Sequence, residues 1–226
     1  MREFLHRTLP FWEDLNEEQK ELAVRYAVSS KFERGETVFN PLKKMAGLKI
    51  VRRGQMKISL PYGSAGDIML YLVREGEVCV LSIMRVMKQF DWAVCAVAVE
   101  DTEVVTIPES IYMKISADNP KAMEYNRNIL IMRMGEIIQV TSESAVSGVP
   151  ERLADLLLRY QKDGGKRKLY LTHEELAKDM GTAREVVSRT LRQFKKQKAI
   201  ETGRGWIMIR NPEYLTEVKR GKYSPE

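Results

Sequence analysis

The segment LTHEELAKDMGTAREVVSRTL, residues 171–191, has the spacing of two short helices joined by a tight turn. Ala177 is small enough to let a second helix approach, and Gly181 can take the positive φ that the turn requires. One inward face at helical spacing is predicted for Val187, Leu191 and Phe194. The segment therefore predicts a helix-turn-helix.

Both helix starts fit the T-x-x-E capping box, in which a threonine oxygen accepts a backbone N–H and a glutamate reaches back to the cap. The two boxes are Thr172–Glu175 and Thr182–Glu185. Glu185 has two alternative roles, because it can cap its own helix or contact a base. Two capped starts ten residues apart support two short helices with a turn between them.

The outward face of the second helix carries side chains of the types that contact base edges and phosphates: Arg184, Glu185, Ser188, Arg189 and Arg192. The alternative is a pair of surface helices that touch no nucleic acid, since short motifs also match by chance. Lys195, Lys196 and Lys198 continue the basic run.

A β-hairpin is predicted after the second helix. Residues 199–202 and 206–209 are rich in β-forming side chains, and Gly203-Arg204-Gly205 supplies the turn with Arg204 at its tip. A hairpin in this place is a wing, although a hairpin that only packs on the helices has the same pattern.

The basic excess lies in the same part of the chain. The protein has 226 residues and a net charge of +6. Residues 149–226 hold 18 Lys and Arg against 11 Asp and Glu, whereas residues 1–148 hold 19 against 20. This asymmetry indicates a polyanionic partner for the C-terminal part alone.

Other classes of protein find little support in the composition. No apolar run approaches the length of a membrane span, and the N-terminus has no signal-peptide pattern, so we expect a cytoplasmic protein with no membrane partner. Cys79 and Cys95 lack zinc-site spacing, and we expect two buried thiols and no metal site.

The N-terminal two-thirds predicts a roll of short strands. One amphipathic helix is expected over residues 12–28, with Leu22, Tyr26 and Val28 on one face. Glycine-punctuated β-rich stretches then follow at 37–39, 48–51, 56–60, 68–73, 78–83, 92–99 and 103–107. Many short strands with glycine turns indicate an antiparallel sandwich or roll.

Two helical segments follow the strands. Pro108-Glu109-Ser110 opens the first, and a long helix runs from Lys121 to about Val146. Its heptad seam of Met123, Leu130 and Ile137, with Val140 near the same face, suits pairing with a second copy of the chain. Packing against its own roll is the alternative, because Asn126 and Arg133 interrupt the seam.

The expected fold is α+β: an antiparallel β-roll, a long dimerisation helix and a winged helix-turn-helix. Residues 144–150 are small and form the candidate hinge, and a leucine-rich helix follows from Glu151 to Tyr160. We therefore divide the chain into residues 1–118, 119–148 and 149–226.

This order of elements, with Arg184-Glu185-x-x-Ser188-Arg189 in the second helix, resembles the CRP/FNR superfamily of bacterial transcription regulators. The resemblance covers nearly the whole chain. Residues 35–39 are similar to the family's early Gly-Glu turn, and residues 140–143 to the end of its central helix. It implies a homodimer that binds double-stranded DNA, acts with RNA polymerase and senses a small-molecule effector in a cyclic-nucleotide-binding-like roll.

The resemblance also implies roles for single residues. Glu185, Ser188 and Arg189 match the E-x-x-S-R pattern of the FNR side, and Arg184 matches the arginine that the CRP side places before its glutamate. The two arginines would bind guanine and Glu185 would accept from cytosine, in a TGTGA-like or TTGAT-like palindrome. Phosphate contacts are expected from Thr172, Thr182, Arg192, Lys195 and Arg204.

The effector is not identified by the sequence. Cyclic-nucleotide binders in the family have a Gly-Glu-Leu turn for ribose and an Arg-Ser pair for phosphate. The aligned stretches here, Val80-Leu81-Ser82 and residues 90–93, offer no arginine, and Asp91 would repel a phosphate. We expect no cyclic AMP binding, although Thr141 and Ser142 match the adenine-contacting pair. An iron–sulfur cluster is also not expected, because four thiolates are the usual set.

The sequence leaves several kinds of effector as alternatives. Cys79 and Cys95 are a possible redox pair, haem is conceivable through His6, Cys79 or methionines, and a small metabolite in the roll is the default. The candidate effector-binding residues are Cys79, Ser82, Trp92, Thr141 and Ser142.

The sequence favours a sequence-specific transcription regulator. The alternative is a small-molecule, redox or haem sensor whose winged helix contacts proteins instead of DNA. An enzyme is expected least, because no nucleophile elbow, phosphate loop, metal cluster or paired-acid motif stands out.

Overall fold

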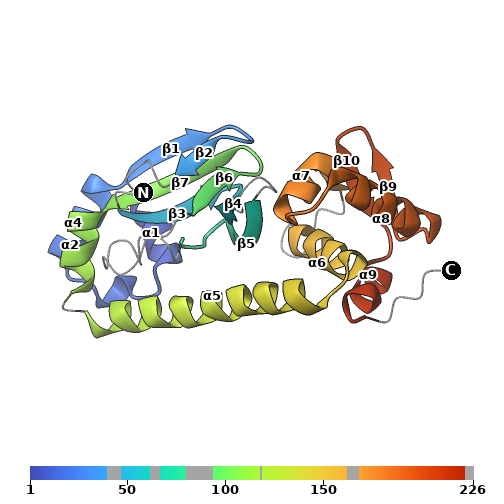
Figure 1. Cartoon of the computed structure of the whole chain (residues 1–226). Coiled ribbons are helices and arrows are strands. Elements are labelled where there is room, and N and C mark those ends of the chain that lie inside the picture. Colours follow the sequence, from blue (N-terminus) through green and yellow to red (C-terminus); the bar gives the residue numbers. More distant parts are fainter. Residues whose placement is uncertain (40–46, 62–66, 80–93, 118, 162–167, 222–226) are drawn as a thin grey trace. The chain divides into compact units, whose positions relative to one another are not determined.

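The computed structural model describes residues 1–39, 47–61, 67–79, 94–117, 119–161 and 168–221, and it leaves out the side chains of residue 61 and residues 139–146. The chain divides into two units. Unit 1 comprises Met1–Ser59 and Leu70–Ile137, and unit 2 comprises Leu60–Met69 and Ile138–Glu226. The elements of both are labelled in Figure 1.

Unit 1 begins with three short helices. They are α1 (Arg2–Thr8), the 3₁₀ helix η1 (Trp12–Asp14) and α2 (Glu17–Tyr26). The prediction of one helix over residues 12–28 is wrong, because the capping box of Asn16 and Gln19 starts a new helix. Tyr26 is exposed, and exposed Val28 already belongs to a strand, so neither lines an inner face.

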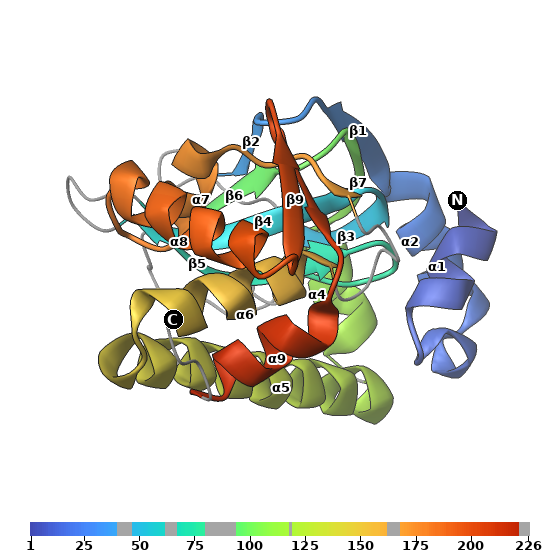
Figure 2. The same cartoon turned by 90° about the vertical axis from the view of Figure 1, so that its right-hand side faces the viewer.

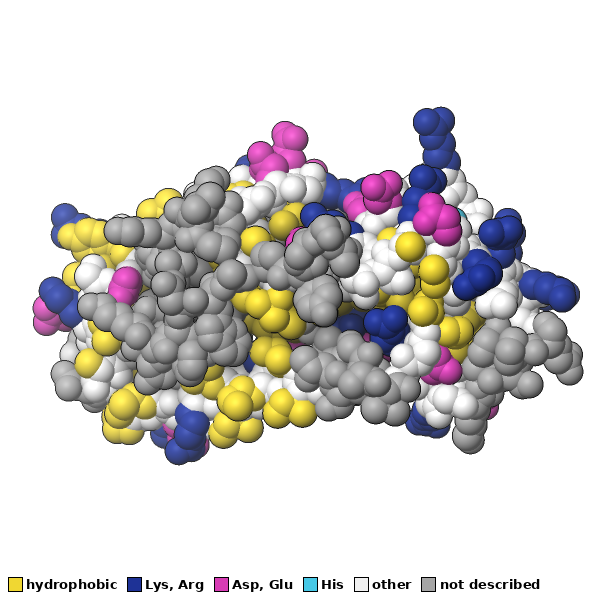
Figure 3. All heavy atoms as spheres, in the orientation of Figure 1, with side chains coloured by type: hydrophobic (Ala, Val, Ile, Leu, Met, Phe, Trp, Pro, Cys, Tyr) yellow, Lys and Arg dark blue, Asp and Glu magenta, His cyan; other side chains and the backbone are white. Residues whose placement is uncertain are grey.

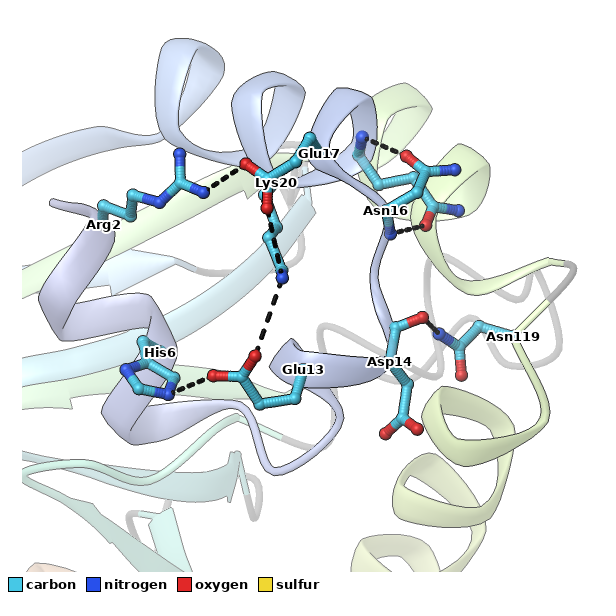
Figure 4. A network of polar contacts seen from close by, with 9 residues as sticks. Arg2, His6, Glu13, Asp14, Asn16, Glu17, Lys20 and Asn119 are labelled. Atoms are coloured by element: carbon cyan, nitrogen blue, oxygen red, sulfur yellow. Dashed lines mark hydrogen bonds and ion pairs between the residues drawn. The ribbon is translucent and has the colours of Figure 1, made fainter.

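A network of polar contacts joins these helices (Figure 4). Lys20 is buried, and its Nζ lies 3.4 Å from Glu17 Oε1 and 3.7 Å from Glu13 Oε2. The other carboxylate oxygen of Glu13 lies 2.6 Å from Nε2 of His6. These contacts give the buried ammonium of Lys20 the partners that burial of a charge requires.

Two antiparallel sheets follow, so the predicted β-roll is confirmed. One has the order β1-β7-β3 and the other the order β2-β6-β4-β5. The strands are β1 (Val28–Phe32), β2 (Thr37–Phe39), β3 (Gly47–Arg53), β4 (Gln55–Pro61), β5 (Asp67–Arg74), β6 (Cys95–Ala98) and β7 (Thr102–Pro108). The predicted stretch 78–83 lies mostly outside the described residues.

The apolar side chains of these strands form the core of unit 1. Fully buried members include Leu48, Ile50, Val51, Met56, Ile58, Val105 and Ile107. Because neither sheet can bury its apolar face alone, the two must pack on each other.

Two helices follow the strands, as predicted. The first, α4 (Glu109–Ser116), begins directly after Pro108, and the second, α5 (Pro120–Val146), is the long helix. A buried hydrogen bond of 2.6 Å from the Tyr112 hydroxyl to Asn126 Oδ1 joins them. Asn126, which interrupts the predicted seam, thus packs inside its own unit.

The long helix α5 has two separate faces. One is buried in unit 1 and carries Ala122, Asn126, Ile129 and Arg133. The other carries Met123, Ile131, Met134 and Ile138, which are 51% or more exposed, as is Met132 outside this stripe. With 100° per residue, the stripe of four spans about 80° and lies about 130° from the buried face. Figure 3 shows hydrophobic side chains along this helix.

The predicted heptad seam lies beside this exposed stripe. Met123 is a member of both, whereas Leu130 and Ile137 are half-buried, and the side chain of Val140 is outside the described residues. Helix α5 therefore both packs on its own roll and carries an exposed apolar stripe.

Unit 2 contains most of the remaining elements. They are α6 (Val149–Gln161), β8 (Lys168–Leu169), α7 (His173–Asp179), α8 (Arg184–Lys196), β9 (Ile200–Gly203), β10 (Trp206–Ile209) and α9 (Pro212–Lys219). The three strands form one antiparallel sheet in the order β8-β10-β9. Figure 2 shows the β9–β10 hairpin beside α8. Among the described residues, no helix is both long enough and apolar enough to cross a bilayer.

Candidate nucleic-acid interface

The first helix of the predicted pair starts as its sequence requires. Thr172 is the N-cap of α7, and its Oγ1 accepts the backbone N–H of Glu175 at 3.1 Å. The Glu175 carboxylate in turn accepts the backbone N–H of Thr172 at 2.7 Å. This capping box is confirmed and fixes the point at which α7 begins.

The second predicted capping box is wrong. Helix α8 starts at Arg184, its N-cap is Ala183, and no side chain caps it. The backbone N–H of Thr182 donates to the Ala177 carbonyl oxygen at 2.9 Å, which makes Thr182 part of the turn. Glu185 is therefore not a capping residue, and its exposed carboxylate stays available for a base.

The turn and the inward face agree with the sequence. Gly181 has a φ of +59°, and Ala177 is buried where the helices cross. Val187, Leu191 and Phe194 are all fully buried. The ring of Phe194 meets that of Tyr214 on α9 edge-on, with centroids 6.4 Å apart. This core fixes the rotation of α8 about its own axis.

The outward face of α8 follows from that rotation. Arg184, Glu185, Arg189, Arg192 and Lys195 are exposed, and Ser188 between them is half-buried. The Ser188 Oγ lies 2.8 Å from Nδ1 of His173, the first residue of α7. The structure thus brings the predicted base-contacting side chains together on one helix face.

The wing also has the predicted form. Trp206 pairs with Gly203, which leaves Arg204 and Gly205 as the turn, and Gly205 has a φ of +75°. Arg204 is exposed at the tip. A Cβ on Gly203 would lie 2.3 Å from the Trp206 indole, so the absence of a side chain lets the ring cover this strand. Lys168 Nζ lies 4.5 Å from the same ring.

Positive charge accompanies this geometry. Of the predicted phosphate-contacting residues, Thr172, Arg192, Lys195 and Arg204 are exposed and Thr182 is half-buried. Figure 3 shows Lys and Arg side chains around the end of unit 2 that carries the wing. A surface of this kind attracts a polyanion.

The predicted effector residues are described only in part. Cys79 is fully buried, as expected, but Cys95 is half-buried, and no disulfide joins these two described residues. Ser82, Trp92 and the side chains of Thr141 and Ser142 lie outside the described residues. Within the described ranges, no three His, Cys, Asp or Glu side chains cluster as a metal site.

The sequence reasoning missed a buried ion cluster in unit 1. The side chain of Arg133 is 4% exposed, and its guanidinium lies 2.6 Å from Glu77 Oε2 and 2.8 Å from Glu136 Oε2. It also lies 5.0 Å from the centre of the Tyr71 ring. Burial disfavours the charge of Arg133, but the hydrogen bonds and charges of Glu136 and Glu77 outweigh it and raise the pKa of Arg133.

A signal for this cluster was present. Gly76-Glu77-Val78 is closer to the family's Gly-Glu-Leu turn than Val80-Leu81-Ser82 is, and Gly76 has a φ of +80°. Burial, followed by the charge of Glu77, raises the pKa of nearby Tyr125 to about 12. The cluster joins α5 to the turn after β5.

Comparisons with known proteins agree with this geometry. The family of Crp-like helix-turn-helix domains matches residues 151–218. The chain is 24% identical to the cyclic AMP receptor protein of Thermus thermophilus, over 94% of this chain and 97% of that protein. It is 25% identical to the global nitrogen regulator of Synechococcus elongatus, over 83% and 87% of the two chains.

A solved structure gives the same result for the fold. A protein from Eubacterium rectale assigned to the CRP/FNR family of transcriptional regulators superposes with a TM-score of 0.82 at 27% identity. The superposition covers 93% of this chain and 98% of that one. The helix-turn-helix region matches the Crp-like family by sequence, and the fold is shared over almost the whole chain with a protein assigned to the CRP/FNR family, so this protein is similar to the transcription regulators of that superfamily.

Proposed function

We propose that the protein is a homodimer that binds a palindromic promoter site in the major groove, under the control of an effector sensed by the β-roll. The observation that carries this proposal is the exposed face of α8. Its rotation is fixed by a buried apolar face, and it presents Arg184, Glu185, Ser188 and Arg189 side by side. These side chains are suited to the donor and acceptor pattern of base edges in the major groove.

The exposed stripe of α5 supports the dimer. Four large apolar side chains on one arc are an unusual surface for a monomer, and a second copy of the same helix offers a matching stripe across a two-fold axis. Two α8 helices in such a dimer would enter successive major grooves, which recur about every 34 Å.

The remaining assignments complete the proposal. We keep residues 1–118 as the sensor, 119–148 as the dimerisation helix with its hinge, and 149–226 as the DNA-binding domain. The proposed effector is a small molecule other than cyclic AMP, because residues 90–93 hold no arginine and Asp91 would repel a phosphate. RNA polymerase is the proposed protein partner, and the cytoplasm is the proposed location.

The first test concerns a single base contact. We expect Arg189→Ala to lose about 1–3 kcal/mol of discrimination at one base pair of each half-site, because a bidentate contact to guanine is removed. The measurement is fluorescence anisotropy with the palindrome that the wild-type protein selects from a library of palindromic duplexes, and with the single-base variants of this selected palindrome. An unchanged order of preference in this variant would remove Arg189 from the base-reading set.

Arg204→Gln is the matched contrast. Its exposed side chain at the wing tip is proposed to contact phosphate, so the variant should bind all duplexes more weakly to a similar extent. The slope of log affinity against log salt should fall by about one per subunit, because one counterion fewer is released. A sequence-dependent loss would instead assign Arg204 to base contact.

A further inference from the structure

One base-contacting candidate shares its hydrogen bond with a titratable ring. Ser188 Oγ on α8 lies 2.8 Å from Nδ1 of His173 on α7. Both side chains are half-buried, and Ser188 stands between the exposed Arg184 and Arg189. The histidine therefore belongs to the first helix but contacts a residue on the outward face of the second.

The chemistry of this pair has two states. A serine hydroxyl has one proton and two lone pairs. If Nδ1 carries no proton, it accepts the hydroxyl proton of Ser188, and the oxygen offers only a lone pair to a third group. If Nδ1 carries a proton, as it must in the imidazolium, it donates to Oγ, and the hydroxyl proton is released for a third group.

We propose that His173 is a specificity-determining residue, because its protonation decides whether Ser188 can donate a hydrogen bond to a base edge or can only accept one. This rests on the DNA-binding function proposed above. The acceptor form suits the amino groups of adenine and cytosine, and the donor form suits the oxygen and nitrogen acceptors of guanine and thymine. In this proposal the neutral ring carries its proton on Nε2.

The surroundings of the His173 ring favour its neutral state at neutral pH, and therefore the form in which Ser188 only accepts a hydrogen bond from a base. Burial lowers the pKa of His173 below its ordinary value, and the charge of Arg184 on α8 lowers it further. On its own helix, the carboxylate of Glu175 is bound to Thr172, and Glu174 is exposed. A depressed pKa means that the imidazolium forms only as the pH falls below that value, and a DNA phosphate beside the ring would raise it.

The test compares base preference at two pH values. Affinities are measured by anisotropy for the selected palindrome and all its single-base variants at pH about 5.5 and about 7.5, at constant salt. At one position per half-site, the preference for guanine or thymine over adenine or cytosine should rise about threefold to tenfold at the lower pH. The affinity ratios at the other base positions should not change with pH. They therefore separate this effect from a general effect of pH on DNA binding.

Three variants separate the alternatives. His173→Gln keeps a hydrogen-bonding side chain that does not titrate, so the ratio should become independent of pH. Ser188→Ala should also abolish the dependence, although the histidine remains. His6→Gln is the matched control, because His6 is the other histidine of the chain and lies in unit 1, and it should behave as wild type.

The outcomes are distinct. A wild-type ratio that does not change with pH, in a protein that still binds the palindrome, overturns the role of His173. A pH-dependent ratio that survives Ser188→Ala also overturns it, since the histidine would then contact DNA by itself. Failure of the wild type to prefer any duplex at either pH would instead overturn the proposed function.

Discussion

The substitution Ile131→Glu on α5 should convert the protein to a monomer and weaken binding to the palindrome by about a hundredfold or more. Ile131 is 62% exposed at the edge of the apolar stripe, so the variant should fold. In the proposed dimer, however, two like charges would face each other across the two-fold axis and lose their water. Light scattering coupled to size exclusion should give 26.1 kDa for the variant and about twice that mass for the wild type.

Asn128→Glu is the matched control. Position 128 is also exposed on α5 but lies about 60° or more from every residue of the stripe, so the same added charge should leave both mass and affinity unchanged. If Ile131→Glu remains dimeric and binds as the wild type does, the dimer does not form through this stripe.

The substitution Gly47→Ala should destabilise unit 1 by about 3–5 kcal/mol. Gly47 has a φ of +135°, and a Cβ there would lie 1.9 Å from the carbonyl oxygen of Ile107 and 2.9 Å from the backbone nitrogen of Glu109. Both atoms belong to backbone beside the β3–β7 ladder, so neither can move without disturbing the sheet. Chemical denaturation followed by circular dichroism measures the loss.

The variant Gly35→Ala separates the cost of backbone strain from the cost of a steric clash. Gly35 also has a positive φ, +88°, but a Cβ there meets no atom within 4 Å. Only the conformational cost applies, which is about 1 kcal/mol. Equal losses of stability in the two variants would mean that the close approach of Gly47 to β7 is not the cause.

The sequence predicted those parts of the fold whose causes lie within a few residues. The capping box of Thr172, the positive φ of Gly181 and the hairpin turn with Arg204 at its tip all depend on local chemistry, and the structure has all three, although Gly203 belongs to β9 and not to the turn. Thr182 fits the same local pattern, but its backbone bonds to Ala177, and that contact depends on how the whole turn closes.

Features that depend on distant partners were not predictable in this way. Strand β1 was not predicted, and its first residue, Val28, was assigned to a helix. Its residues are largely exposed, and it pairs with β7, 70 or more residues later. Arg133 was interpreted as a break in an apolar seam. Its burial depends on Glu77, which lies 56 residues away and supplies the opposite charge. Pattern along one helix does not reveal such a partner.

The two faces of α5 have a consequence for genetics. Subunits altered only on α8, for example by Arg189→Ala, keep the apolar stripe. They would combine with wild-type subunits into mixed dimers in which only one α8 helix can contact its bases. Such alleles are expected to be dominant. Alleles that destroy the stripe at Ile131 leave the wild-type subunits to associate with one another, and are therefore recessive.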